Sequence, residues 1–134
     1  MFIQWSDAYK LGIPSVDTDH KQLVDLLNRF FARAQEGGDT AELGEILNEL
    51  VKQTKAHFTR EEVLLDRGDY PHLALHIAEH HRLLQQMGHF LTPYQAGTAS
   101  RELTVEMAEF LQHWLLDHIV REDMPYRPYL KTLS

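Results

Sequence analysis

A helical repeat of apolar residues organises this sequence, and a few short segments rich in glycine or proline interrupt it. Apolar residues recur every three or four positions, and no stretch alternates for long enough to indicate a β-strand. The interruptions fall at the glycine pair 37–38, at Gly68 and around "TPYQAGTAS", and Pro125 and Pro128 forbid a regular helix near the end. The pattern therefore predicts an all-α chain.

The interruptions divide the sequence into four helical segments. The predicted helices span about 17–36, 40–66, 70–90 and 100–123. Helices of about 20 residues joined by short loops pack as neighbours in opposite directions, which predicts an up-down-up-down antiparallel four-helix bundle. A short N-terminal leader and a C-terminal tail flank the bundle. With 134 residues, of which 43 % are hydrophobic, we expect one domain over residues 1–134 with a real core.

The composition excludes several classes of function. A net charge of −7 argues against nucleic acid and against anionic membrane surfaces as partners. The absence of cysteine excludes disulfides and thiolate metal sites. The start, "MFIQWSDAYK", has no basic region and no long apolar run, so we do not expect a signal peptide. No segment is long and apolar enough for membrane insertion, and we expect a cytoplasmic protein.

Nine histidines are many for an acidic chain of this size. The helical count places five of them on core-facing stripes, with at least one from every predicted helix: His20, His57, His76, His80 and His118. Glu61 shares the stripe of His57. The remaining four lie one position off a stripe and are predicted to be solvated: His72, His81, His89 and His113. The alternative role for His72, His81 and His113 is a proton relay.

A single histidine on an apolar face is usually a hydrogen-bonded core residue. Five histidines with a glutamate are different, because each buried polar group without a partner costs on the order of 1–3 kcal/mol. A domain of this size is stable by only about 5–15 kcal/mol in total. Such a core needs something inside that binds these groups, and the sequence therefore predicts a metal site.

The spacing is typical of metal ligands. His57 and Glu61 are four residues apart, as are His76 and His80, so each pair lies on one face of its helix. Imidazole and carboxylate without thiolate suit iron, manganese or zinc. Six or more ligands exceed what one tetrahedral zinc ion needs, which indicates two metal ions that share carboxylates.

The acidic partner of His118 is not determined by spacing. Glu122 is four residues further on and Asp123 five, and on a regular helix Asp123 lies about 140° around the axis from His118. Periodicity therefore favours Glu122 but leaves Asp123 open. His113 and Asp117 have the same four-residue spacing on the flank of the predicted helix.

The segments that carry these residues resemble the hemerythrins, in particular the bacterial single-domain proteins. The similar motifs are "DTDHKQL", "HFTREE", "YPHLALHIAEH" and "WLLDHIVREDMPY", together with the N-terminal "W.D.Y.LGI". The resemblance covers nearly the whole chain. It implies that Asp123, and not Glu122, is the last ligand.

The resemblance also implies a non-haem centre of two iron ions. By this likeness, His76, His80 and His118 hold one iron, and His20 and His57 hold the other. Glu61 and Asp123 bridge the two irons together with a solvent-derived oxygen. These groups supply eleven of the twelve bonds of two six-coordinate irons, so the iron with two histidines keeps one open position for O2.

The expected function is reversible O2 binding for transport, storage or buffering, without catalysis, with an O2-consuming enzyme as a potential recipient. An apolar O2 pocket is implied at Phe58, Trp114, Leu115 and Ile119, which are also expected as ordinary bundle core. The alternatives are a di-iron oxidase or peroxidase, an iron- or nitric-oxide-handling protein, or a sensor that acts through a separate partner. Ferritin-like oxidases are rich in carboxylates with Glu-x-x-His spacing, and this sequence has neither feature.

Pro125 biases the residue before it away from helical geometry. We hypothesise that the fourth helix ends near Asp123 and that its loosened last turn allows Asp123 to reach the metals. Regular helix through residue 127 would contradict this account.

Overall fold

The computed structural model describes residues 3–118 and 123–130, and none of them lies in a β-strand. The elements are η1 (Asp7–Tyr9), α1 (Pro14–Gln35), α2 (Thr40–Arg67), α3 (Leu73–Gln95), α4 (Arg101–Asp117), η3 (Met124–Tyr126) and α5 (Arg127–Leu130). The two 3₁₀ turns and the short α5 lie outside the four long helices.

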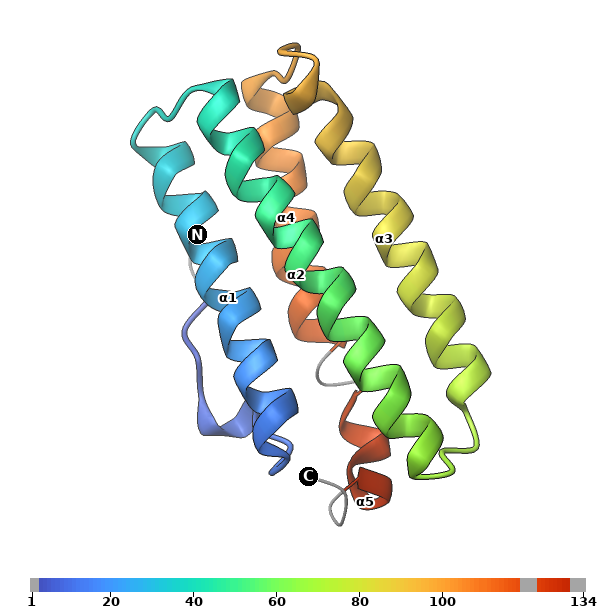
Figure 1. Ribbon diagram of the computed structural model, residues 1–134. Helices are drawn as coiled ribbons and strands as arrows, with labels where there is room; N and C mark the ends of the chain where they lie inside the picture. Colours follow the sequence, from blue (N-terminus) through green and yellow to red (C-terminus); the bar gives the residue numbers. More distant parts are fainter. Residues whose placement is uncertain (1–2, 119–122, 131–134) are drawn as a thin grey trace.

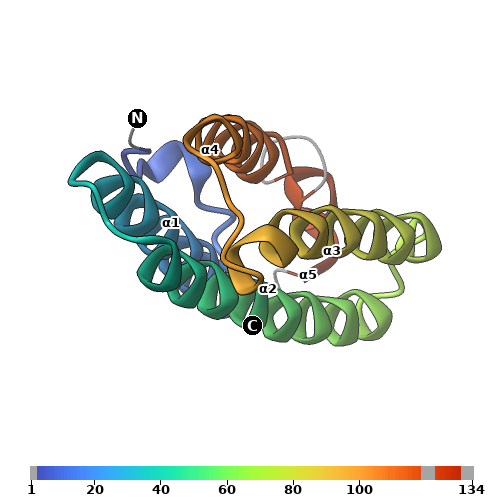
Figure 2. The same cartoon turned by 90° about the horizontal axis from the view of Figure 1, so that it is seen from above.

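The four long helices form an antiparallel bundle. They alternate in direction along the chain, and seen from above they surround a common interior (Figures 1 and 2). α2 packs against both α1 and α3, and α1 packs against α4. The predicted fold class is confirmed. Among the described helices, none combines the length and the apolar character that a membrane span requires.

The observed helices differ from the predicted ones by more than one residue at four ends. α1 begins at Pro14, where the fixed φ of proline suits a first helical turn. α3 begins at Leu73 because Asp69, with φ of 53°, and the bond from the Tyr70 amide to the Leu65 carbonyl turn the chain after α2. α3 then continues past Pro93 to Gln95, since a proline in the last turn removes only one intrahelical hydrogen bond.

The fourth difference is the end of α4, which was predicted near residue 123. Regular α-helix ends at Asp117, while His118 and Asp123 both have π-helical geometry and a 3₁₀ turn follows at Met124–Tyr126. Regular helix therefore does not reach residue 127. Residues 119–122 lie outside the described part of the chain, so the proposed loosening of this turn by Pro125 stays a hypothesis.

The N-terminal leader is anchored along α1. Both oxygens of Asp17 accept backbone hydrogen bonds, from Leu11 at 2.7 Å and from Gly12 at 3.1 Å. The side chain of Asn28 accepts from the Ile3 amide and donates to the Ile3 carbonyl. Leu11 and Ile3 are buried, so the leader completes the core beside the first turns of α1.

Replacing Asp17 by Ala tests this anchor. The change removes the acceptor of two backbone amides, and a hydrogen bond to a charged acceptor contributes about 1.5–3 kcal/mol. We expect the free energy of unfolding to fall by about 2 kcal/mol, measured by urea denaturation. Asp25→Ala, at an exposed position of the same helix, is the control and should change the stability little. Equal effects of the two substitutions would contradict this role of Asp17.

Candidate metal centre

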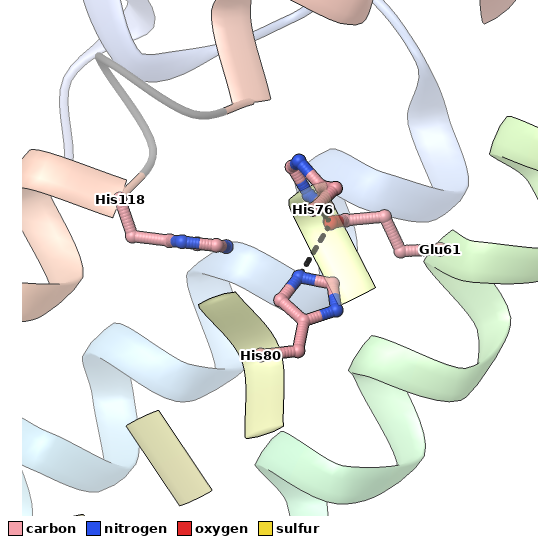
Figure 3. A group of neighbouring side chains, drawn as sticks. All are labelled: Glu61, His76, His80 and His118. Atoms are coloured by element: carbon pink, nitrogen blue, oxygen red, sulfur yellow. Dashed lines mark hydrogen bonds and ion pairs between the residues drawn. The ribbon is translucent and has the colours of Figure 1, made fainter. Parts of the chain in front are cut away.

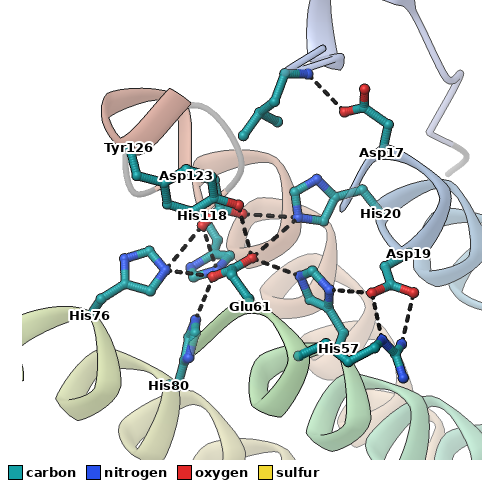
Figure 4. A network of polar contacts seen from close by, with 12 residues as sticks. Asp17, Asp19, His20, His57, Glu61, His76, His80, His118, Asp123 and Tyr126 are labelled. Carbon is teal, nitrogen blue, oxygen red and sulfur yellow. Dashed lines mark hydrogen bonds and ion pairs between the residues drawn. The ribbon is translucent and has the colours of Figure 1, made fainter. Parts of the chain in front are cut away.

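Seven polar side chains meet in the interior of the bundle, and each is at most 4 % exposed. α1 contributes one, α2 two and α3 two, the residue after α4 adds one, and the residue before η3 adds the last (Figure 4). They are His20, His57, Glu61, His76, His80, His118 and Asp123. The four-residue spacings on α2 and α3 aim both members of each pair into the same space, as the sequence predicted.

The carboxylate of Glu61 lies at the middle of this group. Its Oε1 atom is 2.6 Å from Nε2 of His76 and 3.1 Å from Nε2 of His80. Its Oε2 atom faces the opposite way, 3.0 Å from Nε2 of His57 and 3.9 Å from Nε2 of His20. One carboxylate therefore contacts imidazoles from three helices.

Asp123 repeats this division with its own two oxygens. Its Oδ1 atom is 3.2 Å from Nε2 of His118 and 3.3 Å from Nε2 of His76, and its Oδ2 atom is 2.9 Å from Nε2 of His20. The structure thus places Asp123, the residue that regular periodicity disfavoured, in the centre. Asp123 is five residues after His118, and both residues have π-helical rather than regular α-helical geometry.

The contacts divide the histidines into two groups on either side of the carboxylates. His76, His80 and His118 lie on one side with Glu61 (Figure 3). His20 and His57 lie on the other with Glu61 and Asp123. Within each set, the potential ligand atoms lie within 4.8 Å of one another. This is the arrangement expected of two adjacent cation positions that share two carboxylates.

The hydrogen bonding of these groups is a test of whether a metal fits. Nε2 of His20, His57, His80 and His118 and both oxygens of Asp123 are buried without a hydrogen-bond partner among the described residues. They nevertheless lie close to atoms of opposite charge. Lone pairs that converge without satisfying one another are what a shared cation would satisfy, so the donor set fits two metal ions.

Charge balance within the centre shifts the pKa values of its members. Burial disfavours charged imidazoles, but Glu61, Asp19 and Asp123 raise the pKa of His57 to about 9. Burial would likewise lower the pKa of His76, but Asp123 and Glu61 raise it to about 10. Burial would raise the pKa of Glu61, but the surrounding histidines hold it well below its ordinary value. Protons on His57 and His76 thus balance the charge of the carboxylates when no cation does.

Aromatic and aliphatic side chains cover the centre. Phe58 stacks on His80 with ring centroids 3.7 Å apart, and lies 5.5 Å from His118 and 6.5 Å from Trp114. Phe58, Trp114 and Leu115 are buried. The fourth residue of the predicted pocket, Ile119, lies outside the described residues.

The four histidines predicted to be solvated, His72, His81, His89 and His113, are all exposed. His113 and Asp117, which have the spacing of a ligand pair, belong to neither of the two ligand groups. Glu122 lies outside the described part of the chain.

Three residues at the centre were not singled out by the sequence. The hydroxyl of the buried Tyr126 donates to Oε2 of Glu61 at 3.0 Å. Asp19 accepts a hydrogen bond from Nδ1 of His57 and a bidentate pair from Arg60. Burial opposes the ionisation of Asp19, but the hydrogen bonds from His57 and Arg60 lower its pKa to about 2. The available signal was position, since Asp19 and Arg60 directly precede His20 and Glu61.

Comparisons with known proteins agree with this geometry. Residues 11–130 match the family model described as the hemerythrin HHE cation binding domain. The bacteriohemerythrin of Stenotrophomonas maltophilia is 30 % identical over 128 residues, which cover 96 % of this chain and 81 % of that protein. The bacteriohemerythrin of Methylococcus capsulatus is 29 % identical over 96 % of each chain.

A crystal structure of wild-type hemerythrin superposes with a TM-score of 0.86 at 28 % identity, covering 98 % of this chain and 99 % of that one. The likeness therefore extends over the whole bundle and includes the segments that carry the seven buried polar groups. The chain belongs to the hemerythrin family.

Proposed function

We propose that this protein binds O2 reversibly at a non-haem centre of two iron ions and serves in O2 transport, storage or buffering. The observation that carries the proposal is the division of the two carboxylates, each of which turns one oxygen toward each group of histidines. Membership of the hemerythrin family supports iron as the metal.

The ligands follow from the same contacts. One iron would be held by His76, His80 and His118, and the other by His20 and His57, all through Nε2. Glu61 and Asp123 would bridge the two positions together with a solvent-derived oxygen. The position with two imidazoles has fewer protein ligands and is therefore the place for O2.

When bound by these residues, two iron ions would supply the electrons that O2 accepts on binding and would recover them on release. The protein's own residues control what reaches the pair. Phe58, Trp114 and Leu115 form an apolar wall, for which Ile119 is a further candidate, and this wall keeps water away from the bound ligand. Tyr126 donates to Glu61 and holds the carboxylate in its bridging orientation.

Binding without catalysis is favoured by the chemistry of the ligands. Five imidazoles and two carboxylates give the pair less anionic charge than a ferritin-like site provides, which restrains it from the higher oxidation states that attack on substrates requires. A di-iron oxidase, an iron- or nitric-oxide-handling protein and a sensor remain the alternatives, and the titration below distinguishes the oxidase. A cytoplasmic location and an O2-consuming recipient enzyme remain predictions.

An anaerobic-to-aerobic optical titration tests the function. We expect the reduced, iron-loaded protein to develop a visible absorption band in air, and this band should disappear when O2 is removed, over repeated cycles. Metal analysis should give two irons per chain. Irreversible conversion to the ferric form in a single exposure would favour an oxidase instead.

Replacing Glu61 by Ala tests the bridging role. The variant leaves the surrounding imidazoles without the buried counter-charge of Glu61, and breaking a buried pair costs about 3–5 kcal/mol. We expect most of the bound iron to be lost together with stability of this order, measured by metal analysis and urea denaturation. Glu45→Ala, at an exposed position of α2, is the control. Two irons retained in the Glu61 variant would contradict the assignment.

The pKa shifts predict that the stability of the metal-free form, but not of the loaded form, falls at alkaline pH. The raised pKa values of His57 and His76 stabilise the metal-free protein fully below about pH 6.5, and this contribution is lost as the pH rises through 9–10. The lowered pKa of Glu61 contributes stability above about pH 4.5 that is lost in acid. Metal-free protein should therefore be most stable between about pH 4.5 and 6.5.

In the loaded form, cations replace these protons, so we expect the alkaline decline to disappear and metal uptake at pH 7 to release protons. Urea denaturation across pH, with and without a chelator, measures the first effect, and calorimetry in buffers of different ionisation enthalpy measures the second. The same alkaline profile in both forms would contradict this account.

A further inference from the structure

We propose that Asp19, held by Arg60, is a positioning residue that sets the donor strength of His57 and thereby the ligand affinity of the metal position with two histidines. The inference rests on the proposed function and extends it to regulation of the same site. Neither Asp19 nor Arg60 is among the seven ligands, so both act through His57.

His57 and Asp19 lie side by side at the edge of the centre (Figure 4), and the hydrogen bonds from Arg60 to Asp19 continue this connection to the surface. Nδ1 of His57 lies 2.9 Å from Oδ2 of Asp19, while its Nε2 faces Glu61. Arg60 donates from Nε to the same Oδ2 at 3.0 Å and from Nη2 to Oδ1 at 2.7 Å. The side chain of His57 is 1 % exposed, that of Asp19 13 % and that of Arg60 53 %.

This environment distinguishes His57 from other histidines of the centre. The Nδ1 atoms of His20, His80 and His118 are buried and have no hydrogen-bond partner among the described residues. The carboxylate of Glu62 lies 3.6 Å from Nδ1 of His80, too far for a hydrogen bond. The charged acceptor at Nδ1 thus makes His57 a stronger electron donor. His57 belongs to the metal position with two imidazoles, where each imidazole supplies a larger share of the donated charge.

The hydrogen bond has two chemical effects. It keeps the proton on Nδ1, which leaves the Nε2 lone pair of His57 free for a metal, and the negative charge of Asp19 makes the imidazole a stronger donor. A more electron-rich iron favours a ligand that draws electrons from it, as O2 does. Asp19 therefore raises the affinity for O2.

Arg60 acts in the opposite direction. Its guanidinium shares Oδ2 of Asp19 with His57, so it draws toward itself part of the charge that the imidazole would otherwise receive. The pair sets an intermediate donor strength. If Asp19 and Arg60 only supported the fold, substitution of either residue would weaken O2 binding. In the arrangement proposed, substitution of Asp19 weakens O2 binding and substitution of Arg60 strengthens it.

Two nearly isosteric substitutions separate these possibilities. Asp19→Asn removes the negative charge and keeps an acceptor for His57, and Arg60→Gln removes the positive charge and keeps a donor for Asp19. Asp25→Asn on α1 and Lys55→Gln on α2 change the net charge equally at exposed positions and serve as matched controls. Thermal melts of each variant check that the bundle is intact.

Three quantities are measured on iron-loaded protein: the O2 dissociation constant, the midpoint potential of the iron pair and the rate of iron loss to a chelator. We expect Asp19→Asn to weaken O2 binding about tenfold, to raise the potential and to speed iron loss. Arg60→Gln should strengthen O2 binding several-fold, lower the potential and slow iron loss. The controls should resemble the unmodified protein.

Shifts of the same sign in both variants, or shifts no larger than those of the controls, would overturn the inference. This failure is distinct from failure of the proposed function. If the unmodified protein did not bind O2 reversibly, the function would be wrong, while the potential and the rate of iron loss would still decide whether Asp19 and Arg60 act in opposite directions through His57.

Discussion

The burial of two carboxylates at one point among five imidazoles is the constraint on which this structure depends. Glu61 and Asp123 are fully buried, and a carboxylate in that position persists only when positive charge surrounds it. No single helix can supply that charge. The four helices must therefore meet at one level of the bundle, and the leader and the turn at Met124–Tyr126 must exclude water from the centre.

Packing between aromatic rings also helps to orient the imidazoles. Phe58 lies parallel to His80 at 3.7 Å, and edge-to-face contacts relate His20 to His57 and His76 to His80. Rings held in this way have little freedom to turn, because a dense core offers each one a single position. The packing thus directs these rings toward one another, and a cation between them would satisfy lone pairs that converge.

The features that depend on helical periodicity were predictable from the sequence. A repeat of 3.6 residues fixes which side chains share a face, so the bundle and the buried positions of His57, Glu61, His76 and His80 followed from spacing alone. The position of Asp123 did not, because regular periodicity favoured Glu122, and Pro125 indicated only that the helix ends nearby and not which carboxylate reaches the centre. The contact between Asp19 and Arg60 joins positions 41 residues apart, and only the packing of α1 against α2 brings them together.

The distribution of the ligands along the chain has a consequence for assembly. His57, Glu61, His76 and His80 all belong to the hairpin of α2 and α3, whose connection is only a few residues long. Such a hairpin closes a short loop and brings its ligands together early, whereas His20 and Asp123 must arrive from the two ends of the chain. The hairpin alone therefore carries enough ligands for a first cation. The docking of the outer helices then completes the ligand set and encloses the second cation.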